Sequence, residues 1–328
     1  MTKLPTFLKI VLLSLILFSE MDCSMAATNK LELIELSPLP NGETANSVKL
    51  ERTRDGIVAV ASTSTPSPIL GATTHYFALP VGGRETSWKT VASISQMVPS
   101  MIAWDAVILR DGLQLTYELA GGAVNAIIVR TPSGVEQSVT ASVPLESFSK
   151  PRFEHTDGNA PVLLTAVLDQ KQCVVLQVAN AMPYQVLADC EEGVLIRNGT
   201  SFLLFYKVTE LGPVRGNSTL PGRLYALPLN DRLQKSGPAS TVTDSTIYEF
   251  DAVLRNGQVA VCATTPDGVW IGRGESQGSV LRFPGALWVA PITLASPTLA
   301  FSVANGGAEK FKLGVIDLTT QRILVAEF

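Results

Sequence analysis

Residues 54–60 read Arg-Asp-Gly-Ile-Val-Ala-Val, and this combination of a turn and a strand returns three times along the chain. The further copies begin at Arg110-Asp111-Gly112, Arg197-Asn198-Gly199 and Arg255-Asn256-Gly257. Asp-Gly and Asn-Gly favour tight two-residue hairpin turns, because these turns need residues with positive φ. An apolar, strand-like run follows each copy. The repeat therefore predicts one hairpin that recurs through an all-β fold.

Counting outward from this hairpin gives six units, with turns expected near residues 56, 112, 171, 199, 257 and 297. The mean spacing of about 48 residues is typical of β-propeller blades with four strands each. The sequence predicts a six-bladed propeller, with five or seven blades as alternatives and a pair of β-sandwiches as the rival fold. The short interval from 171 to 199 leaves open that one blade lacks an outer strand.

A propeller avoids exposed sheet edges by closing its ring. The alternating run Leu31–Leu36 and the final run Arg322–Phe328 are both strand-like. We expect these two segments to pair in one blade and so to close the ring.

Composition narrows the classes of partner. The 328 residues are 46% hydrophobic and 16% charged, with a formal net charge of -4. No run rich in lysine and arginine appears, so we expect no nucleic-acid partner. His75 and His155 are the only histidines, and no glycine-rich phosphate loop is present. We therefore expect neither a metal nor a cofactor.

The first 26 residues are typical of a signal peptide. Lys3 and Lys9 precede the apolar run 10–18, and a small-residue site ends at Ala26. We expect cleavage after Ala26, a secreted or periplasmic protein, and a single domain over 27–328 without a membrane span. A short N-terminal anchor is the alternative.

Cys173 and Cys190 flank a predicted hairpin, which would place them opposite each other. Export permits a disulfide, and cross-strand neighbours meet its distance requirement. We predict a Cys173–Cys190 disulfide, with two separate buried thiols as the alternative.

Three turns resemble the Asp box of sialidase-like propellers, a hairpin motif of the form Ser-x-Asp-x-Gly-x-Thr-Trp. They are Thr265-Pro266-Asp267-Gly268-Val269-Trp270, Thr131-Pro132-Ser133-Gly134, and Gly82-Gly83 leading to Ser87-Trp88. The resemblance implies a six-bladed ring and a carbohydrate as the substrate class. Sialidases of that superfamily use an arginine cluster, a Tyr/Glu nucleophile pair and a carboxylic acid. Tyr117-Glu118 and Tyr248-Glu249 do not match that pair, because adjacent strand residues point to opposite faces.

Two aspartates follow an aromatic residue in matching positions, Trp104-Asp105 and Phe250-Asp251. On innermost strands, their carboxylates would face the central channel and bind a cation or a sugar hydroxyl. The alternative is a repeated structural hydrogen bond to neighbouring backbone. Asp105 and Asp251 are therefore candidate ligand-binding residues.

The arginines before the four turns form a second candidate set: Arg54, Arg110, Arg197 and Arg255. Gathered at one mouth of the ring they would bind an anion. The alternative is structural, because a long charged side chain beside a turn solvates a strand end. Arg110 and Arg255 are the candidates from this set.

Because no complete catalytic motif is present, the leading expectation is a binding or scaffolding propeller that recognises a glycan or a protein and is not an enzyme. The first alternative is a sialidase-like glycoside hydrolase. The second is a structural component of the cell envelope, which would expose an apolar patch. The candidate patch residues are Trp88, Trp104, Trp270 and Trp288.

Overall fold

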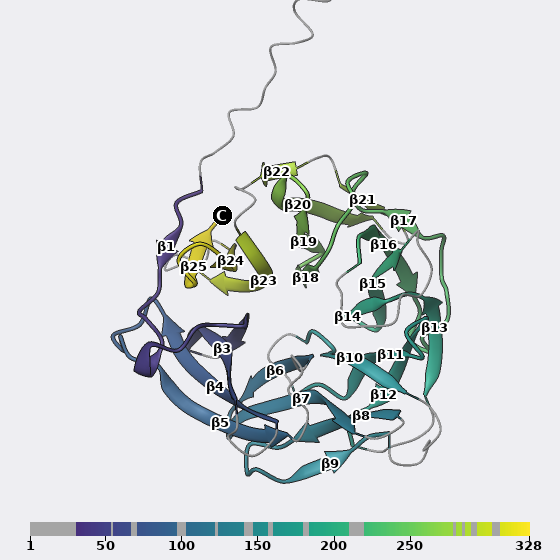
Figure 1. The fold of residues 1–328 in the computed structure, drawn as a ribbon. Coiled ribbons are helices and arrows are strands. Elements are labelled where there is room, and N and C mark those ends of the chain that lie inside the picture. Colours follow the sequence, from purple (N-terminus) through teal and green to yellow (C-terminus); the bar gives the residue numbers. More distant parts are fainter. Residues whose placement is uncertain are drawn as a thin grey trace, which may run out of the picture. The chain divides into compact units, whose positions relative to one another are not determined.

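The computed structural model describes residues 31–53, 55–66, 71–96, 103–121, 124–140, 147–156, 160–179, 184–209, 220–277, 280–283, 286–289, 294–303 and 309–328. The predicted signal peptide (1–26) and Arg54 lie outside these residues. The described strands form six antiparallel sheets arranged around a ring, which confirms the all-β propeller and its six blades (Figure 1).

The blades are numbered here along the chain, and each is given from its innermost strand outward. Blade 1 contains β2 (Ser47–Thr53), β3 (Gly56–Pro66), β4 (Ala72–Val81) and β5 (Lys89–Gln96). Blade 2 contains β6 (Trp104–Leu109), β7 (Gly112–Gly121), β8 (Val124–Arg130) and β9 (Glu136–Ser138). Blade 3 contains β10 (Phe148–Phe153), β11 (Leu163–Leu168), β12 (Gln172–Gln177) and β13 (Gln185–Asp189).

Blade 4 contains β14 (Glu192–Asn198), β15 (Ser201–Thr209), β16 (Gly222–Leu229) and β17 (Ser240–Thr241). Blade 5 contains β18 (Phe250–Arg255), β19 (Gln258–Thr265), β20 (Gly268–Gln277) and β21 (Val280–Arg282), with β22 (Ala286–Val289) also paired to β20. Blade 6 contains β23 (Leu294–Val303), β24 (Glu309–Asp317), β25 (Arg322–Glu327) and β1 (Ile34–Glu35). A short 3-10 helix, η1, spans Pro40–Gly42.

The recurring turn of the sequence joins the innermost strand to the second strand in blades 1, 2, 4 and 5. Its glycines have positive φ: 134° at Gly112, 63° at Gly199 and 79° at Gly257. In blade 5 the preceding Asn256 is also left-handed, with φ 47°. The turn chemistry was therefore interpreted correctly, and it fixes where the innermost strands end.

Of the six expected turns, the one near residue 171 is present but joins different strands of its blade, and the one near residue 297 is wrong. The turn near residue 171 joins β11 to β12, the second and third strands of blade 3. Position 297 lies inside β23, at a register shift between Ala295 and Thr298. Blade 3 nevertheless has all four strands, because its innermost strand is β10, which lies upstream of the segment assigned to that unit.

Apolar side chains form one cluster at each blade boundary. The cluster between blades 4 and 5 contains Phe205 and Phe250, and the cluster between blades 6 and 1 contains Leu50 and Val325. Blade faces thus bury their apolar residues against each other, while the innermost strands meet around the axis. Among the described residues, no helix is long and apolar enough to cross a membrane.

The expected closure of the ring is confirmed. β1 pairs with β25, with Ile34 opposite Val325 and Glu35 opposite Leu324. The strand continues with a hydrogen bond of 2.9 Å from the backbone N–H of Leu36 to the carbonyl of Ile323. The first described strand therefore completes the blade built from the last three.

Leu36→Pro is expected to destabilise the ring more than Leu36→Ala does. Both changes remove the same side-chain packing, but only proline removes the N–H that bonds to Ile323. The extra loss should be about 1–2 kcal/mol of unfolding free energy, as measured by urea denaturation. Equal midpoints for the two variants would show that this closing hydrogen bond contributes nothing.

Candidate functional site

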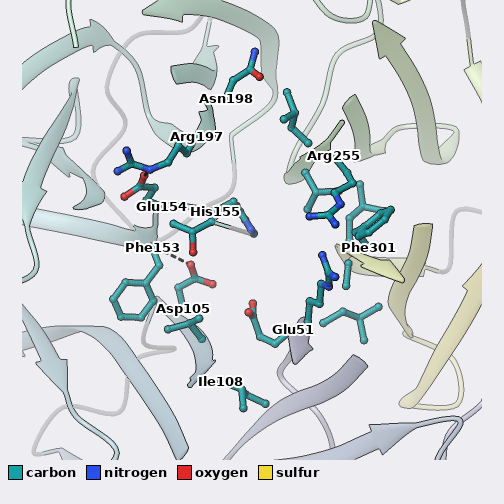
Figure 2. A pocket seen from close by; sticks show the side chains of 18 of the residues that line it. Glu51, Asp105, Ile108, Phe153, Glu154, His155, Arg197, Asn198, Arg255 and Phe301 are labelled. Carbon is teal, nitrogen blue, oxygen red and sulfur yellow. Dashed lines mark hydrogen bonds and ion pairs between the residues drawn. The ribbon is translucent and has the colours of Figure 1, made fainter. Parts of the chain in front are cut away.

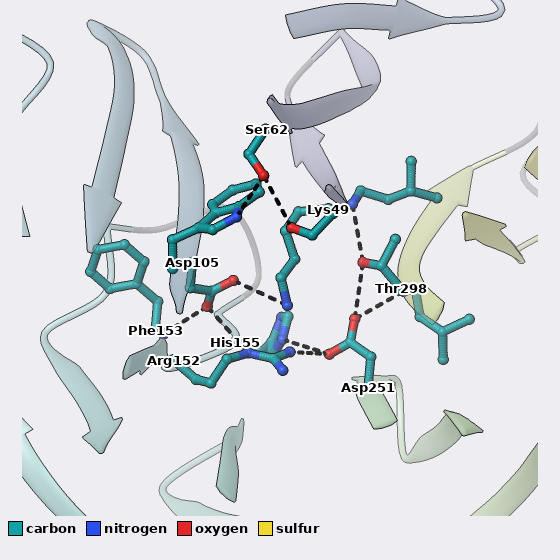
Figure 3. A network of polar contacts seen from close by, with 12 residues as sticks. Lys49, Ser62, Asp105, Arg152, Phe153, His155, Asp251 and Thr298 are labelled. Carbon is teal, nitrogen blue, oxygen red and sulfur yellow. Dashed lines mark hydrogen bonds and ion pairs between the residues drawn. The ribbon is translucent and has the colours of Figure 1, made fainter. Parts of the chain in front are cut away.

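The innermost strands place one charged side chain each from five blades around the axis. This central charge layer consists of Lys49, Asp105, Arg152, Glu192 and Asp251. Figure 3 labels all of them except Glu192. Blade 6 adds the hydroxyl of Thr298. Lys49, Asp105 and Asp251 each lie four residues before the last residue of their innermost strand, so the repeat brings these three side chains to one level of the channel.

Asp105 is almost fully buried and joins three blades. Its Oδ2 accepts a hydrogen bond of 2.8 Å from the backbone N–H of Phe153 in blade 3. The same oxygen lies 3.6 Å from Nε of Arg152, and Oδ1 lies 3.7 Å from Nζ of Lys49 in blade 1. The structural hydrogen bond considered from the sequence is present, and cations also surround the carboxylate.

Asp251 of blade 5 is held in a similar way, by the neighbouring blade 6 and by Arg152 of blade 3. Its Oδ2 accepts hydrogen bonds from the N–H of Leu299 (2.9 Å) and the hydroxyl of Thr298 (3.1 Å), while Oδ1 accepts one from Arg152 (2.5 Å). Burial alone would raise the pKa of this carboxyl. The guanidinium of Arg152 and the nearby His155 and Lys49 overcome that effect and hold its pKa well below the usual range.

A pocket of about 660 Å³ opens beside the charge layer, among the ends of the innermost strands. Figure 2 shows Asp105, Glu154 and His155 on one side, Arg255 and Phe301 on the other, and Glu51 between them. We call this cavity the central pocket. Its wall is formed by the innermost strands of all six blades. Blade 3 supplies Phe153 at the end of β10 and residues 154–156 of the chain that follows.

Glu51 is the carboxyl group of the pocket with the most altered proton affinity. Burial raises its pKa well above the ordinary value, and the negative charges of Asp105 and Asp251 raise it further. Lys49 and Arg152 oppose this shift but are the smaller influences. Glu51 therefore retains its proton to a higher pH than a solvated glutamate does.

The arginines of the pocket are fixed by aromatic rings. The guanidinium carbons of Arg52 and Arg255 lie 5.1 and 4.9 Å from the centroid of Phe301. On the opposite side, Nε of Arg197 lies 2.6 Å from Oε1 of Glu154. Such stacking limits the freedom of a long side chain and keeps its charge at the cavity wall.

Three of the four ligand-binding candidates from the sequence lie at or beside the central pocket, and one does not. Asp105 and Arg255 line the central pocket, and Asp251 lies in the adjoining charge layer. Arg110 is exposed in its turn and is not part of the pocket wall. Whether any of these residues binds a ligand stays a prediction. Within the described part of the chain, no group of three or more His, Cys, Asp or Glu side chains is arranged to hold a metal ion.

Several residues of the site were missed from the sequence. Lys49 and Glu51 stand in the first unit, which has no aromatic-Asp pair, and Arg152 stands in the innermost strand that the repeat did not locate. Aligning the units on their turn glycines would have found Lys49 and Glu192. Nothing comparable marks His155, whose Nε2 lies 3.7 Å from Oδ1 of Asp251.

The two cysteines lie close together, as the hairpin prediction required. Cys173 is in β12, Cys190 directly follows β13, and both are buried free thiols. Burial, with a contact to Cys173, raises the pKa of the Cys190 thiol. The disulfide stays a prediction.

Three of the four tryptophans proposed for an exposed patch are buried. Trp88, Trp104 and Trp270 are each at most 7% exposed. Trp288 lies in β22 opposite Ile271.

The Asp-box-like turns do not have equivalent places in their blades. The Thr131 turn joins β8 to β9, the third and fourth strands, whereas the Thr265 turn joins β19 to β20, the second and third strands.

No protein-family model and no curated protein matches the sequence. Among solved structures, the chain is similar to an α-L-arabinanase from Penicillium chrysogenum complexed with arabinobiose, with 11% identity, a TM-score of 0.60, and coverage of 90% of this chain and 97% of that one. An α-L-arabinofuranosidase from Fusarium graminearum with an iminosugar inhibitor has 10% identity and a TM-score of 0.57, with coverage of 90% and 97%.

A mutant of Trypanosoma rangeli sialidase that displays trans-sialidase activity is also similar, with 7% identity and a TM-score of 0.52. The alignment covers 90% of this chain and 58% of the sialidase. At these identities the similarity establishes the fold, and it confirms the resemblance to sialidase-like propellers at that level. The expectation of a non-catalytic binding or scaffolding module is wrong on this comparison, because these neighbours are carbohydrate-active enzymes and favour the hydrolase alternative.

Proposed function

We propose that the chain is a glycoside hydrolase with a sialidase-like propeller, and that its active site is the central pocket. The observation that carries this proposal is a pair of carboxyl groups in one cavity with opposite surroundings. Glu51 is buried among negative charges, which favour its protonated form. Asp105 lies beside the cations Lys49 and Arg152 and accepts a hydrogen bond from a backbone N–H.

Glycoside hydrolysis needs these two roles. A carboxylic acid protonates the glycosidic oxygen as the bond to the sugar breaks, and a carboxylate stabilises the positive charge that develops on the ring. Environments that push the proton affinities of two acids apart assign the roles. Glu51 is the proton donor in this proposal, and Asp105 is the carboxylate. Water completes the reaction by adding to the anomeric carbon, and its proton returns to the site.

The predicted signal peptide agrees with a reaction on extracellular glycans. It would direct export of the chain to the cell exterior or the periplasm, with cleavage after Ala26. The similarity in fold to an arabinanase, an arabinofuranosidase and a sialidase supports carbohydrate as the substrate class.

The test is a panel of aryl glycosides, with α-L-arabinofuranosides and sialosides included, assayed with the purified protein. Turnover is expected on at least one substrate, and Asp105→Asn should reduce kcat at least about 100-fold, because the amide cannot stabilise a cationic transition state. Asp231→Asn is the matched control, since Asp231 is exposed in a surface turn. A folded protein that turns over no glycoside of the panel, or an Asp105→Asn variant with normal kcat, contradicts the proposal.

A further inference from the structure

Arg152 occupies its central position because of an irregularity in β10. The pairing of β10 with β11 shifts between Ser149 and Arg152, and Lys150 within the shift has a φ of 50°. One extra residue in a strand exchanges the two faces of everything after it. The bulge therefore decides the face to which Arg152 points, and its side chain extends into the central charge layer (Figure 3).

The single guanidinium of Arg152 contacts carboxylates from three other blades. The distances are 3.6 Å from Nε to Asp105 of blade 2, 3.4 Å from Nη1 to Glu192 of blade 4, and 2.5 Å from Nη2 to Asp251 of blade 5. The side chain is only 7% exposed. Nη1 and Nη2 each donate a hydrogen bond to a different carboxylate, and Nε lies at ion-pair distance from Asp105 without a hydrogen bond. The point charge of a lysine cannot reproduce this planar fork.

Arg152 and the next residue, Phe153, both contact the carboxylate of Asp105. Oδ2 of Asp105 faces Nε of Arg152 and accepts a hydrogen bond from the backbone N–H of Phe153. Adjacent positions of one strand thus hold the same oxygen from two directions. Asp105 lines the central pocket, so this arrangement determines how the carboxylate is presented to a ligand.

The charged groups around Arg152 form a nearly balanced set. Lys49 and Lys207 add two cations beside the three carboxylates that Arg152 contacts, and His155 lies next to Asp251. Glu51 and Glu249 also belong to this surrounding, and burial raises the pKa of both. The three basic side chains Lys49, Arg152 and Lys207 thus lie beside the carboxyl groups of Asp105, Glu192 and Asp251, and burial lowers the pKa of Lys207.

We infer that Arg152 is a positioning residue of the active site, which holds the Asp105 carboxylate directed into the central pocket. It does not touch the substrate in this arrangement and acts through Asp105. The inference rests on the proposed hydrolase function, because the position of Asp105 matters to a reaction only if one takes place in the pocket.

Arg152→Lys tests the inference with the positive charge retained. We expect kcat on a turned-over aryl glycoside to fall about 10- to 100-fold, since misplacement of a catalytic group by about 1 Å has effects of this size, while KM stays near the wild-type value. The acid limb of the pH–rate profile should also change, because a lysine satisfies fewer of the carboxylates around Arg152, Asp251 among them. Arg130→Lys is the matched control, as Arg130 pairs with Glu136 in the outer part of blade 2.

A second readout does not depend on turnover. With 13C-labelled aspartate side chains, the carboxyl signal of Asp251 should titrate at higher pH in Arg152→Lys than in the wild-type protein, because Arg152 lowers the pKa of this carboxyl. The chemical shift of the Asp105 carboxyl signal at pH 7 should also change, because its contact with Arg152 is altered. A wild-type kcat and pH profile in the variant would overturn the inference. If the wild-type protein hydrolyses no glycoside, the proposed function fails, and an unchanged Asp105 carboxyl signal would then also refute the role of Arg152 in holding Asp105.

Discussion

Glu51→Gln is expected to lower kcat about 100- to 10,000-fold on glycosides with a poor leaving group, because glutamine has no proton to donate. The effect should depend on the substrate. A dinitrophenyl leaving group departs without protonation, so the variant should recover most of its activity on dinitrophenyl glycosides. Measuring kcat over a series of leaving groups separates loss of the acid from general damage.

The pH dependence of the activity provides a second test of Glu51 as the proton donor. The activity of the wild-type protein should persist to a pH above the ordinary glutamate range and then fall as Glu51 loses its proton, because the pKa of Glu51 is raised. In Glu51→Gln that basic limb should disappear.

The stability of the variant provides a further check. An acid with a raised folded-state pKa costs stability as pH rises from its unfolded-state value toward its folded-state value, since the unfolded chain releases the proton first. Glu51→Gln removes this cost and should unfold at a higher urea concentration than the wild-type protein at pH 7. Glu85→Gln, an exposed partner of Lys89, is the control and should change neither property. Equal losses on all leaving groups would remove Glu51 from the role of proton donor.

Asp251→Ala should have the largest effect on stability, about 3–5 kcal/mol, because it leaves the buried charge of Arg152 without its closest partner. The change also removes the acceptor for the N–H of Leu299 and the hydroxyl of Thr298, which join blade 5 to blade 6. Asp251→Asn keeps an acceptor at this place and should lose less. Urea denaturation measures both variants, and Asp231→Ala should stay within about 0.5 kcal/mol of the wild-type protein.

The contribution of Asp251 to the free energy of unfolding depends on pH. The pKa of Asp251 is lower in the folded chain than in the unfolded chain, so its contribution is complete above the ordinary aspartate pKa and decreases below it. The difference in unfolding free energy between the wild-type protein and Asp251→Asn should therefore be constant from pH 7 to about 5 and shrink below about 4. A difference that grows on acidification would contradict the ion pair.

The sequence predicted the fold well because the fold depends on a local signal. An Asn-Gly or Asp-Gly turn fixes the hairpin wherever it stands, and Gly199 and Gly257 adopt the backbone angles that it requires. Where a unit lacks the turn, the prediction failed: β10 contains Lys150 and Pro151 at a bulge and did not look like a strand.

The site was harder to predict because its members come from different blades. Asp105 and Asp251 were found through their aromatic neighbours, which recur in the sequence. Glu51 has no such marker, and its altered proton affinity comes from charges brought together by folding. The role of Arg152 depends on a one-residue bulge, which no residue pattern reports.

The pairing of β1 with β25 also sets an order of events in the making of the protein. A ribosome delivers residues 34 and 35 long before residues 322–327, so blade 6 lacks a complete set of strands until the later residues have been made. Until then, the growing chain carries a strand edge without its partner. A chain that stops before residue 322 leaves that edge open permanently, and such a product should therefore aggregate or be degraded.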